Sequence, residues 1–345
     1  MFLLLFGVII FGGISGKVAS ILFDAQLKKD RGLIKLSRIS GHFIICGWKP
    51  DFEHILEGIF RANPDLSADE IVLINNAPQE QLDNIKAQAR FKGIKFLSGD
   101  YTDEATLLRA NVKKADRVLV LADRSQNFSP LEIDSRTVLT ILTIKEISNQ
   151  RVYTAAELID SKFEQHLTVA RCDEVILTQD YERSLLISAS SGQGLSHVLR
   201  ELLTEVSSEG LVIGDPVDED GNSYVGQSYG TFRTSLNGGK VLIGILENTG
   251  KFYNRRKEAL AAAQRNPDIK SIIKNLKEVK KMKSNEPVLT PPDDYIIPMN
   301  AKAIFVCGHK HNAGTEKNTG TEGNNANPEK KSLKDKMKEI TKKEK

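Results

Sequence analysis

A short apolar strand that runs directly into a glycine constrains this chain more than any other feature. Residues His42–Cys46 suit a buried strand, Gly47 follows at once, and Asp51–Arg61 has the pattern of a helix. This order opens a Rossmann-type βαβ unit, in which the end of the strand and the start of the helix face a ligand. A dinucleotide fingerprint would continue as G-x-G-x-x-G, but Gly47 is followed here by Trp-Lys-Pro. The scaffold of a nucleotide sensor is present without its phosphate-binding glycines.

The alternation of strand and helix continues to about residue 180. Further apolar strands are expected at Glu70–Asn75, Ile94–Leu97, Arg117–Leu121, Arg151–Ala155 and Glu174–Leu177. Helices are expected between them at Pro78–Phe91, Asp103–Ala110, Ile133–Ile147 and Ser161–Ala170. Apolar strands alternating with helices predict a doubly wound parallel sheet covered on both faces, so residues 40–180 form a Rossmann-like α/β lobe.

The pattern changes after this lobe. Residues 181–207 form a long helical stretch broken at two glycines, with more apolar side chains than one helix face normally buries, among them Leu195, Leu199 and Leu202. Such an excess predicts either a surface for a partner or packing on the sheet. Residues 208–308 read as a small α+β lobe that carries a basic helical insertion at 252–283, and the Lys-rich tail 309–345 is expected to be disordered.

The amino terminus is strongly apolar. Residues 1–25 carry one basic side chain, Lys17, and approach the ~20 mainly apolar residues that a spanning helix needs. The linker 26–39 is basic, which places that side in the cytoplasm. We expect one transmembrane helix. The competing interpretation is a cleaved signal peptide, but the basic residues that should precede its apolar core are missing.

Charge is distributed unevenly along the chain. The net charge is +3, yet Lys251–Ser284 contributes +8 and the tail from His309 contributes +4, so the remaining residues carry −9. A nucleic-acid binder would spread a basic face over its fold. We therefore expect no nucleic-acid partner.

Five segments, taken in order, resemble one known family. They are HFIICGW at His42–Trp48, FLSGDYTDEATLLRANVKKADRVLVL at Phe96–Leu121, RVYTAAEL at Arg151–Leu158, RCDEVIL at Arg171–Leu177 and PVLTPPDDYIIPMNAKAIFVCG at Pro287–Gly308. In this order they are similar to the RCK domains (TrkA-N plus TrkA-C) of prokaryotic ligand-gated potassium channels, and above all to the calcium-gated type. The resemblance covers roughly residues 40–308, and the insertion 252–283 has no counterpart in it.

The resemblance implies a cytoplasmic gating module that senses a ligand and regulates potassium transport through a membrane pore. Residues 1–25 take the place of the inner pore helix. Copies would pair through the crossover 181–207, with Leu195, Leu199 and Leu202, as dimers that build a tetrameric or octameric ring. The chain has no T-V-G-Y-G string, and the similar Ser228-Tyr229-Gly230 in the carboxyl-terminal lobe is expected to be a simple turn. Because potassium selectivity needs a ring of filter carbonyls, this chain alone does not supply the whole pore.

The resemblance also implies an adenine nucleotide or NAD at the strand ends. Its expected contacts are Gly47, Trp48, Asn75, Gly99, Asp100 and Asp123. Asparagine replaces the acid that usually holds the ribose hydroxyls, but an amide can still hydrogen-bond a hydroxyl. A plain strand–helix turn at Gly47 and a helix cap at Asp100 are the competing interpretations.

Calcium is the other ligand that the resemblance implies. The family site uses an acid at the end of the fourth strand and two acids around the fifth. Leu121 stands at the first of these positions with Asp123 two residues on, Glu157 matches one fifth-strand acid, and Ala155 replaces the other. Glu157 is therefore the candidate metal ligand.

No residue pattern indicates catalysis, so we expect no enzymatic activity. Two other functions remain open. The first is a TrkA-like, NAD-binding regulatory subunit of a potassium transporter, and the second is an NAD-dependent oxidoreductase, which would need a catalytic Lys, Tyr or His facing the glycine turn.

Overall fold

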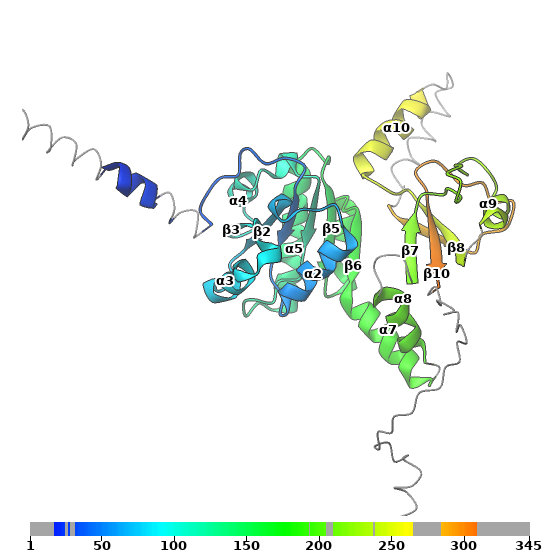
Figure 1. Cartoon of the computed structure of the whole chain (residues 1–345), viewed down its shortest axis with the longest axis horizontal. Coiled ribbons are helices and arrows are strands. Elements are labelled where there is room, and N and C mark those ends of the chain that lie inside the picture. Colours follow the sequence, from blue (N-terminus) through cyan, green and yellow to red (C-terminus); the bar gives the residue numbers. More distant parts are fainter. Residues whose placement is uncertain are drawn as a thin grey trace, which may run out of the picture. The chain divides into compact units, whose positions relative to one another are not determined.

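The computed structural model describes residues 17–24, 27, 32–192, 194–204, 210–236, 239–264 and 284–308. Figure 1 shows two lobes, one built on strands β1 to β6 and the other on strands β7 to β10, each with helices of its own.

The first lobe is built on a six-stranded parallel sheet. Its strands lie in the order β3-β2-β1-β4-β5-β6. Their bounds are β1 Phe43–Cys46, β2 Ile71–Asn75, β3 Lys95–Ser98, β4 Arg117–Val120, β5 Tyr153–Leu158 and β6 Glu174–Leu177. The strand order reverses between β1 and β4, which is the switch point where ligands of doubly wound sheets bind.

Helices cover both faces of this sheet. On one face, α2 (Phe52–Ala62) and α3 (Gln79–Ala87) pack through Leu56 and Ile85. On the other face lie α4 (Glu104–Arg109), α5 (Pro130–Ile147) and α6 (Glu164–Val169), which pack through residues such as Ile141. β1 is buried on both faces, with alternate residues in the two cores. The predicted Rossmann-like lobe is confirmed.

Two element boundaries differ from the expectation in ways that matter for the site. Helix α5 begins at Pro130 instead of Ile133, because the Ser129 side chain accepts a hydrogen bond from the Glu132 N–H and proline suits the first helical position. Strand β5 runs two to three residues later than expected, so Glu157 lies inside the strand instead of beyond it.

The crossover consists of two helices. Helix α7 (Thr178–Ser190) and helix α8 (Leu195–Thr204) contact each other, and Gly192 and Gly194 between them have φ angles of 69° and 71°. Figure 1 shows them as a hairpin. Left-handed backbone of this kind is easily reached only by glycine, which explains the break.

The second lobe has an antiparallel four-stranded sheet in the order β7-β10-β8-β9. Its elements are β7 Gly210–Gly214, α9 Tyr229–Ser235, β8 Lys240–Glu247, α10 Phe252–Gln264, β9 Glu286–Leu289 and β10 Lys302–Cys307. The core on one face of the sheet is centred on Phe232, which has no exposed surface and packs near Phe305.

One segment of this lobe was misjudged from the sequence. Ser228–Gly230 reads as a simple turn, but it opens helix α9, because the Ser228 hydroxyl accepts a hydrogen bond from the Thr231 N–H. The basic insertion begins with helix α10, and residues 265–283 lie outside the described residues, as does the tail 309–345.

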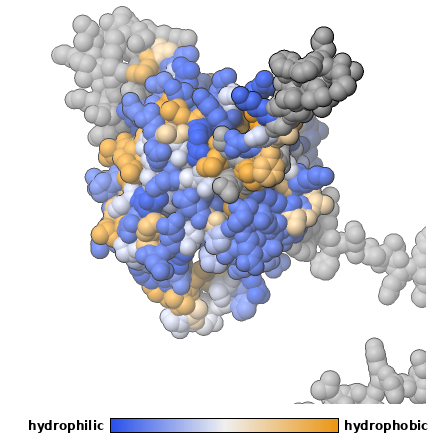
Figure 2. Space-filling view, turned by 90° about the vertical axis from the view of Figure 1, so that its left-hand side faces the viewer, coloured by the Kyte–Doolittle hydropathy of each residue, from blue (hydrophilic) through white to orange (hydrophobic). Residues whose placement is uncertain are grey.

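The predicted transmembrane segment lies mostly outside the described residues. Within the described ranges, no helix is both long and apolar enough to cross a membrane. On the face drawn in Figure 2, hydrophilic residues cover most of the surface and hydrophobic residues form separate patches.

Candidate ligand site at the strand ends

The β1 turn and the β4 loop meet at the switch point. Gly47 has a φ of 91°, and a Cβ added there would lie 3.1 Å from the Leu121 carbonyl oxygen and 3.3 Å from the Asp123 Cβ. The two segments are also joined by a hydrogen bond from the Leu121 N–H to the Cys46 carbonyl. Glycine is therefore required here to let two parts of the chain approach, whatever the ligand.

The residues after Gly47 do not form a phosphate cradle. The Gly47 N–H donates to the Ile74 carbonyl at 3.0 Å, so it is already used. Trp48 is buried and stacks on Phe52 with ring centroids 4.4 Å apart. Helix α2 begins beside two acids, Asp51 at its N-cap and Glu53 in its first turn. Asp51 makes no capping hydrogen bond, but two carboxylates near this helix end would repel a phosphate, because like charges repel each other.

A salt bridge joins this turn to strand β5. The Lys49 Nζ lies 2.6 Å from the Glu157 Oε1, and the Glu157 Oε2 accepts a hydrogen bond from the Ala122 N–H at 3.0 Å. The Glu157 side chain is 4% exposed and that of Lys49 is 24% exposed. Three segments, the β1 turn, the β4 loop and β5, are tied together by one carboxylate.

The geometry does not fit a calcium ion at Glu157. Calcium needs several converging oxygen ligands. The two Glu157 oxygens already serve Lys49 and Ala122, and Ala155 supplies no side-chain oxygen. Among the residues that the structure describes, no group of three or more His, Cys, Asp or Glu side chains is placed to hold a metal.

Asn75 is the predicted contact whose surroundings most suggest a ligand. It ends β2, next to the Gly47 turn, and is 3% exposed. Its Oδ1 accepts a hydrogen bond from the Ala77 N–H at 3.1 Å, whereas its Nδ2 is buried without a hydrogen-bond partner in the described chain. A buried donor left unpaired costs about 1–3 kcal/mol, which a ligand acceptor would recover.

Asp100 follows Gly99 at the end of β3 and is already paired. Its Oδ1 accepts hydrogen bonds from the Thr102 N–H and hydroxyl and from the Arg136 guanidinium at 2.7 Å. Burial acts to raise the pKa of Asp100, but these hydrogen bonds outweigh it and lower the pKa overall. Gly99 has a φ of 155°, and a Cβ there would lie 2.9 Å from the Oγ1 of the buried Thr106, so close packing and backbone conformation both favour glycine here.

Asp123 is buried after β4, and its Oδ1 accepts a hydrogen bond from the Ser125 N–H at 2.9 Å. Burial, and after it the negative charge of Asp123, raises the pKa of Tyr101. The Arg136 guanidinium lies over the Tyr101 ring, 5.2 Å from its centroid. Asp100, Tyr101, Asp123 and Arg136 therefore form one polar cluster over the strand ends.

The structure thus brings the predicted contacts to the same edge of the sheet, but it adds three residues that the sequence did not single out. Lys49 pairs with Glu157, Arg136 pairs with Asp100, and the Tyr101 ring lies under the Arg136 guanidinium. Lys49 offered a signal, because it directly follows the glycine turn. Arg136 offered none, because nothing in a helix sequence says which exposed-looking arginine will fold back over a neighbouring loop.

The crossover hairpin is rich in exposed apolar side chains. Leu195 is 41% exposed, and Leu199 and Leu202 are half-buried. No residue of α7 is buried, and the exposed apolar members of the hairpin are Tyr181, Leu185, Leu186, Ile187, Leu195, Val198 and Leu203. The part of the chain that the structure describes leaves this apolar surface uncovered.

Residues 38–179 match the family model described as "Calcium-activated potassium channel slowpoke-like RCK domain". The calcium-gated potassium channel TvoK of Thermoplasma volcanium is 28% identical over 206 residues, covering 59% of this chain and 55% of that protein. The putative potassium channel protein YugO of Bacillus subtilis is 26% identical over 140 residues, covering 41% of this chain and 39% of that protein. The chain therefore spans about half or less of the length of these relatives.

Solved structures match this chain at low identity and with TM-scores below 0.5. The human SLO3 gating ring has a TM-score of 0.45 and 14% identity, covering 76% of this chain and 44% of its own. The GsuK channel bound to NAD has a TM-score of 0.39 and 17% identity, covering 86% of this chain and 42% of its own.

Proposed function

We propose that this chain, whose residues 38–179 are an RCK domain, is the ligand-sensing gating module of a potassium channel. The observation that carries the proposal is the exposed apolar hairpin α7–α8, which directly follows the RCK domain. A sensor that works by moving one copy against another needs such a surface, whereas a self-contained enzyme does not.

The hairpin supports assembly into a homodimer that builds a larger ring. Leu199 and Leu202 lie on α8 and are already half-buried, so burying the rest of each side chain against a partner is worth about 0.8–1.5 kcal/mol, half the value for a fully exposed leucine. In the double variant Leu199→Asp/Leu202→Asp, two buried charges would oppose association. We expect its mass by light scattering, measured on the full chain in detergent, to fall to that of a smaller assembly.

The matched control for this test is Val169→Asp. Val169 is 75% exposed at the end of α6, away from the hairpin sequence. It should leave the oligomeric mass unchanged. If the hairpin variant keeps the wild-type mass, the crossover is not the interface.

We propose an adenine nucleotide or NAD as the ligand. The ends of β2 and β3 support this ligand, whereas the Gly47 turn does not. The unpaired Asn75 donor and the polar cluster around Asp100 suit the hydroxyls of a ribose. The Gly47 turn does not suit a pyrophosphate, because its N–H is used and α2 begins among acids. We infer that the nucleoside part is recognised at the ends of β2 and β3, and that the phosphates do not lie on the α2 amino end.

The test is a thermal-shift titration of the full chain with ADP, ATP, NAD and Ca²⁺. A ligand of the native state raises the unfolding temperature. Asn75→Leu should abolish the shift given by the nucleotide, while Asn254→Leu, an exposed amide on α10, should not. A shift with Ca²⁺ alone, or a nucleotide shift that survives Asn75→Leu, would contradict the assignment.

Membrane attachment and the pore belong to the same proposal. In the described part of the amino terminus, helical residues Val18, Ile21, Leu22 and Phe23 are 50–67% exposed, as expected of side chains that face lipid or a partner helix. In this arrangement the lobes are cytoplasmic, and the linker 26–39 transmits their movement to residues 1–25. Ligand-dependent potassium flux into vesicles from cells expressing the gene with its upstream sequence tests the channel.

The TrkA-like transporter subunit is the alternative that the same geometry allows. It predicts that the chain co-purifies with a separate pore protein, and that no filter sequence lies in frame ahead of Met1. An in-frame filter would favour the channel instead.

A further inference from the structure

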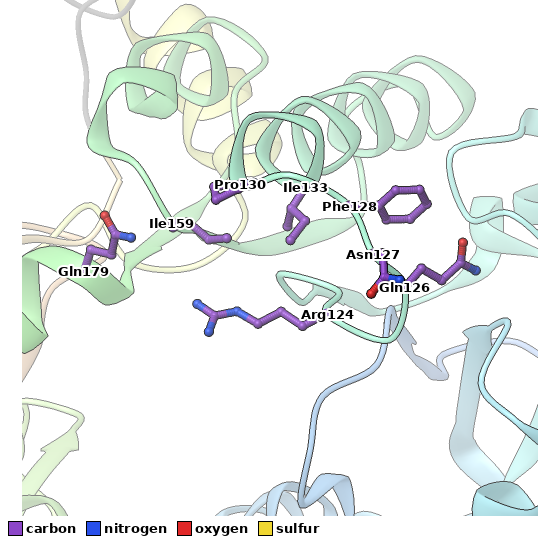
Figure 3. Close-up of a pocket in the computed structure, with 8 residues that line it drawn as sticks. All are labelled: Arg124, Gln126, Asn127, Phe128, Pro130, Ile133, Ile159 and Gln179. Carbon is purple, nitrogen blue, oxygen red and sulfur yellow. The ribbon is translucent and has the colours of Figure 1, made fainter.

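A pocket of about 400 Å³ lies between the β4–α5 loop, the end of β5 and the first turn of α7. It is lined by Arg124, Gln126, Asn127, Phe128, Pro130, Ile133, Ile159 and Gln179. Figure 3 shows Ile133 and Ile159 between Gln179 at one end and Phe128 at the other, with the Arg124 side chain extended past them. Its volume falls within the range of small-molecule sites.

The pocket has an apolar wall and a polar rim. Ile133 and Ile159 are 5% and 3% exposed and pack with Phe128 in one small cluster. The rim consists of exposed side chains, the three amides of Gln126, Asn127 and Gln179 and the guanidinium of Arg124. A wall and rim of this kind suit a ligand with an apolar body and one polar end.

The polar end of that ligand should be an anion. None of the eight lining residues carries a carboxylate. The Arg124 guanidinium forms no hydrogen bond or ion pair with the part of the chain that the structure describes. The nearby acid Asp134 does not offset this, because its two oxygens accept the Ile159 and Asp160 N–H groups at 2.8 Å each. A free guanidinium fork matches a carboxylate or a phosphate.

We propose that this pocket binds a small organic anion whose apolar body rests on Ile133 and Ile159 and whose carboxylate or phosphate is held by Arg124. The site is separate from the nucleoside contacts at Asn75 and Asp100. Arg124 links the pocket to the Gly47 turn, because its N–H donates to the Trp48 carbonyl at 3.2 Å and its side chain lines the pocket.

The pocket also includes the start of the crossover. Gln179 is the second residue of α7, so a ligand that contacts it touches the helix that leads into the hairpin. Binding here therefore joins the Rossmann lobe to the crossover through one molecule. An effect of the bound anion on gating rests on the proposed function. Binding of the anion does not depend on the proposed function.

The test uses calorimetric titration of the full chain with phenyl phosphate and with benzoate, which share an aromatic body and differ in the anion. Benzyl alcohol and inorganic phosphate supply the body and the anion separately. Arg124→Gln should weaken binding about tenfold or more, since it removes a charge-assisted contact. Gln179→Glu, which adds a carboxylate without changing size, should weaken it similarly.

The matched control is Arg61→Gln, at an exposed arginine on α2, which should bind as the wild type does. Tighter binding of one probe identifies the anion as phosphate or carboxylate. The proposal is overturned if neither aromatic anion binds, if Arg124→Gln binds as tightly as the wild type, or if benzyl alcohol or inorganic phosphate binds as well as the aromatic anions. These titrations measure ligand binding, whereas the gating proposal is tested by the oligomeric mass. A failure to bind is therefore distinguishable from a failure to assemble.

Discussion

Replacing Lys49 by methionine tests whether the salt bridge to Glu157 holds the switch point together. The change keeps most of the side-chain length and removes the ammonium that lies 2.6 Å from the carboxylate. Glu157 then keeps one hydrogen-bond donor, the Ala122 N–H, in a setting where its side chain is 4% exposed.

The expected loss follows from the burial of the two partners. Breaking a fully buried pair costs about 3–5 kcal/mol, because it leaves an unpaired charge away from water. Lys49 is 24% exposed, so water partly replaces it, and we expect a loss of about 2 kcal/mol in the free energy of unfolding. In a lobe of this size such a loss lowers the melting temperature by about 4–8 °C.

The assay is thermal unfolding followed by tryptophan fluorescence. Trp48 is the only tryptophan in the sequence, and it directly precedes Lys49, so the signal reports on this site. The control is Lys86→Met, whose 3.7 Å pair with Asp83 is exposed and should be worth about 0.5 kcal/mol or less.

A double-mutant cycle decides the result. Adding Glu157→Gln to Lys49→Met removes the unpaired charge, so the double variant should regain much of the lost stability. The reasoning is refuted if Lys49→Met is no worse than Lys86→Met, or if the two changes at Lys49 and Glu157 are simply additive.

Two further variants test the turns around this site. Gly47→Ala should destabilise the chain by about 1–3 kcal/mol in urea unfolding, because alanine at a φ of 91° is strained and its Cβ would lie 3.1 Å from the Leu121 oxygen; a neutral effect would contradict this. Asp100→Asn should lower the melting temperature at pH 6, and the difference from the wild type should shrink as the pH falls below about 3.8. The reason is that a carboxyl whose pKa is lowered in the folded state stops stabilising the fold once it is protonated. If the loss of melting temperature does not change with pH, the ion pair between the Asp100 carboxylate and Arg136 does not stabilise the fold.

The fold of the first lobe could be predicted because its information is local. Each strand is a short apolar run, each helix follows its strand after a turn, and the right-handed crossover leaves few ways to assemble them. The errors were also local. Helix α9 was missed because a single serine hydroxyl at Ser228 changes a turn into a helix start.

The sequence predicted where the site residues lie, but not which contacts they make with one another. Asn75 ends its strand, Gly47, Gly99, Asp100 and Asp123 follow theirs, and the carboxyl ends of parallel strands meet at one edge of the sheet. From this the sequence determines which residues gather there.

Only the tertiary structure decides what those residues do to one another. Lys49 pairs with Glu157 across 108 positions of sequence, and Arg136 reaches Asp100 across 36. Such pairs depend on side-chain directions and on which loops close over which, and no local pattern records them. The glycine turn that looked like a damaged phosphate site is instead a close contact between two loops, secured by a lysine, beside an asparagine whose donor remains for a ligand.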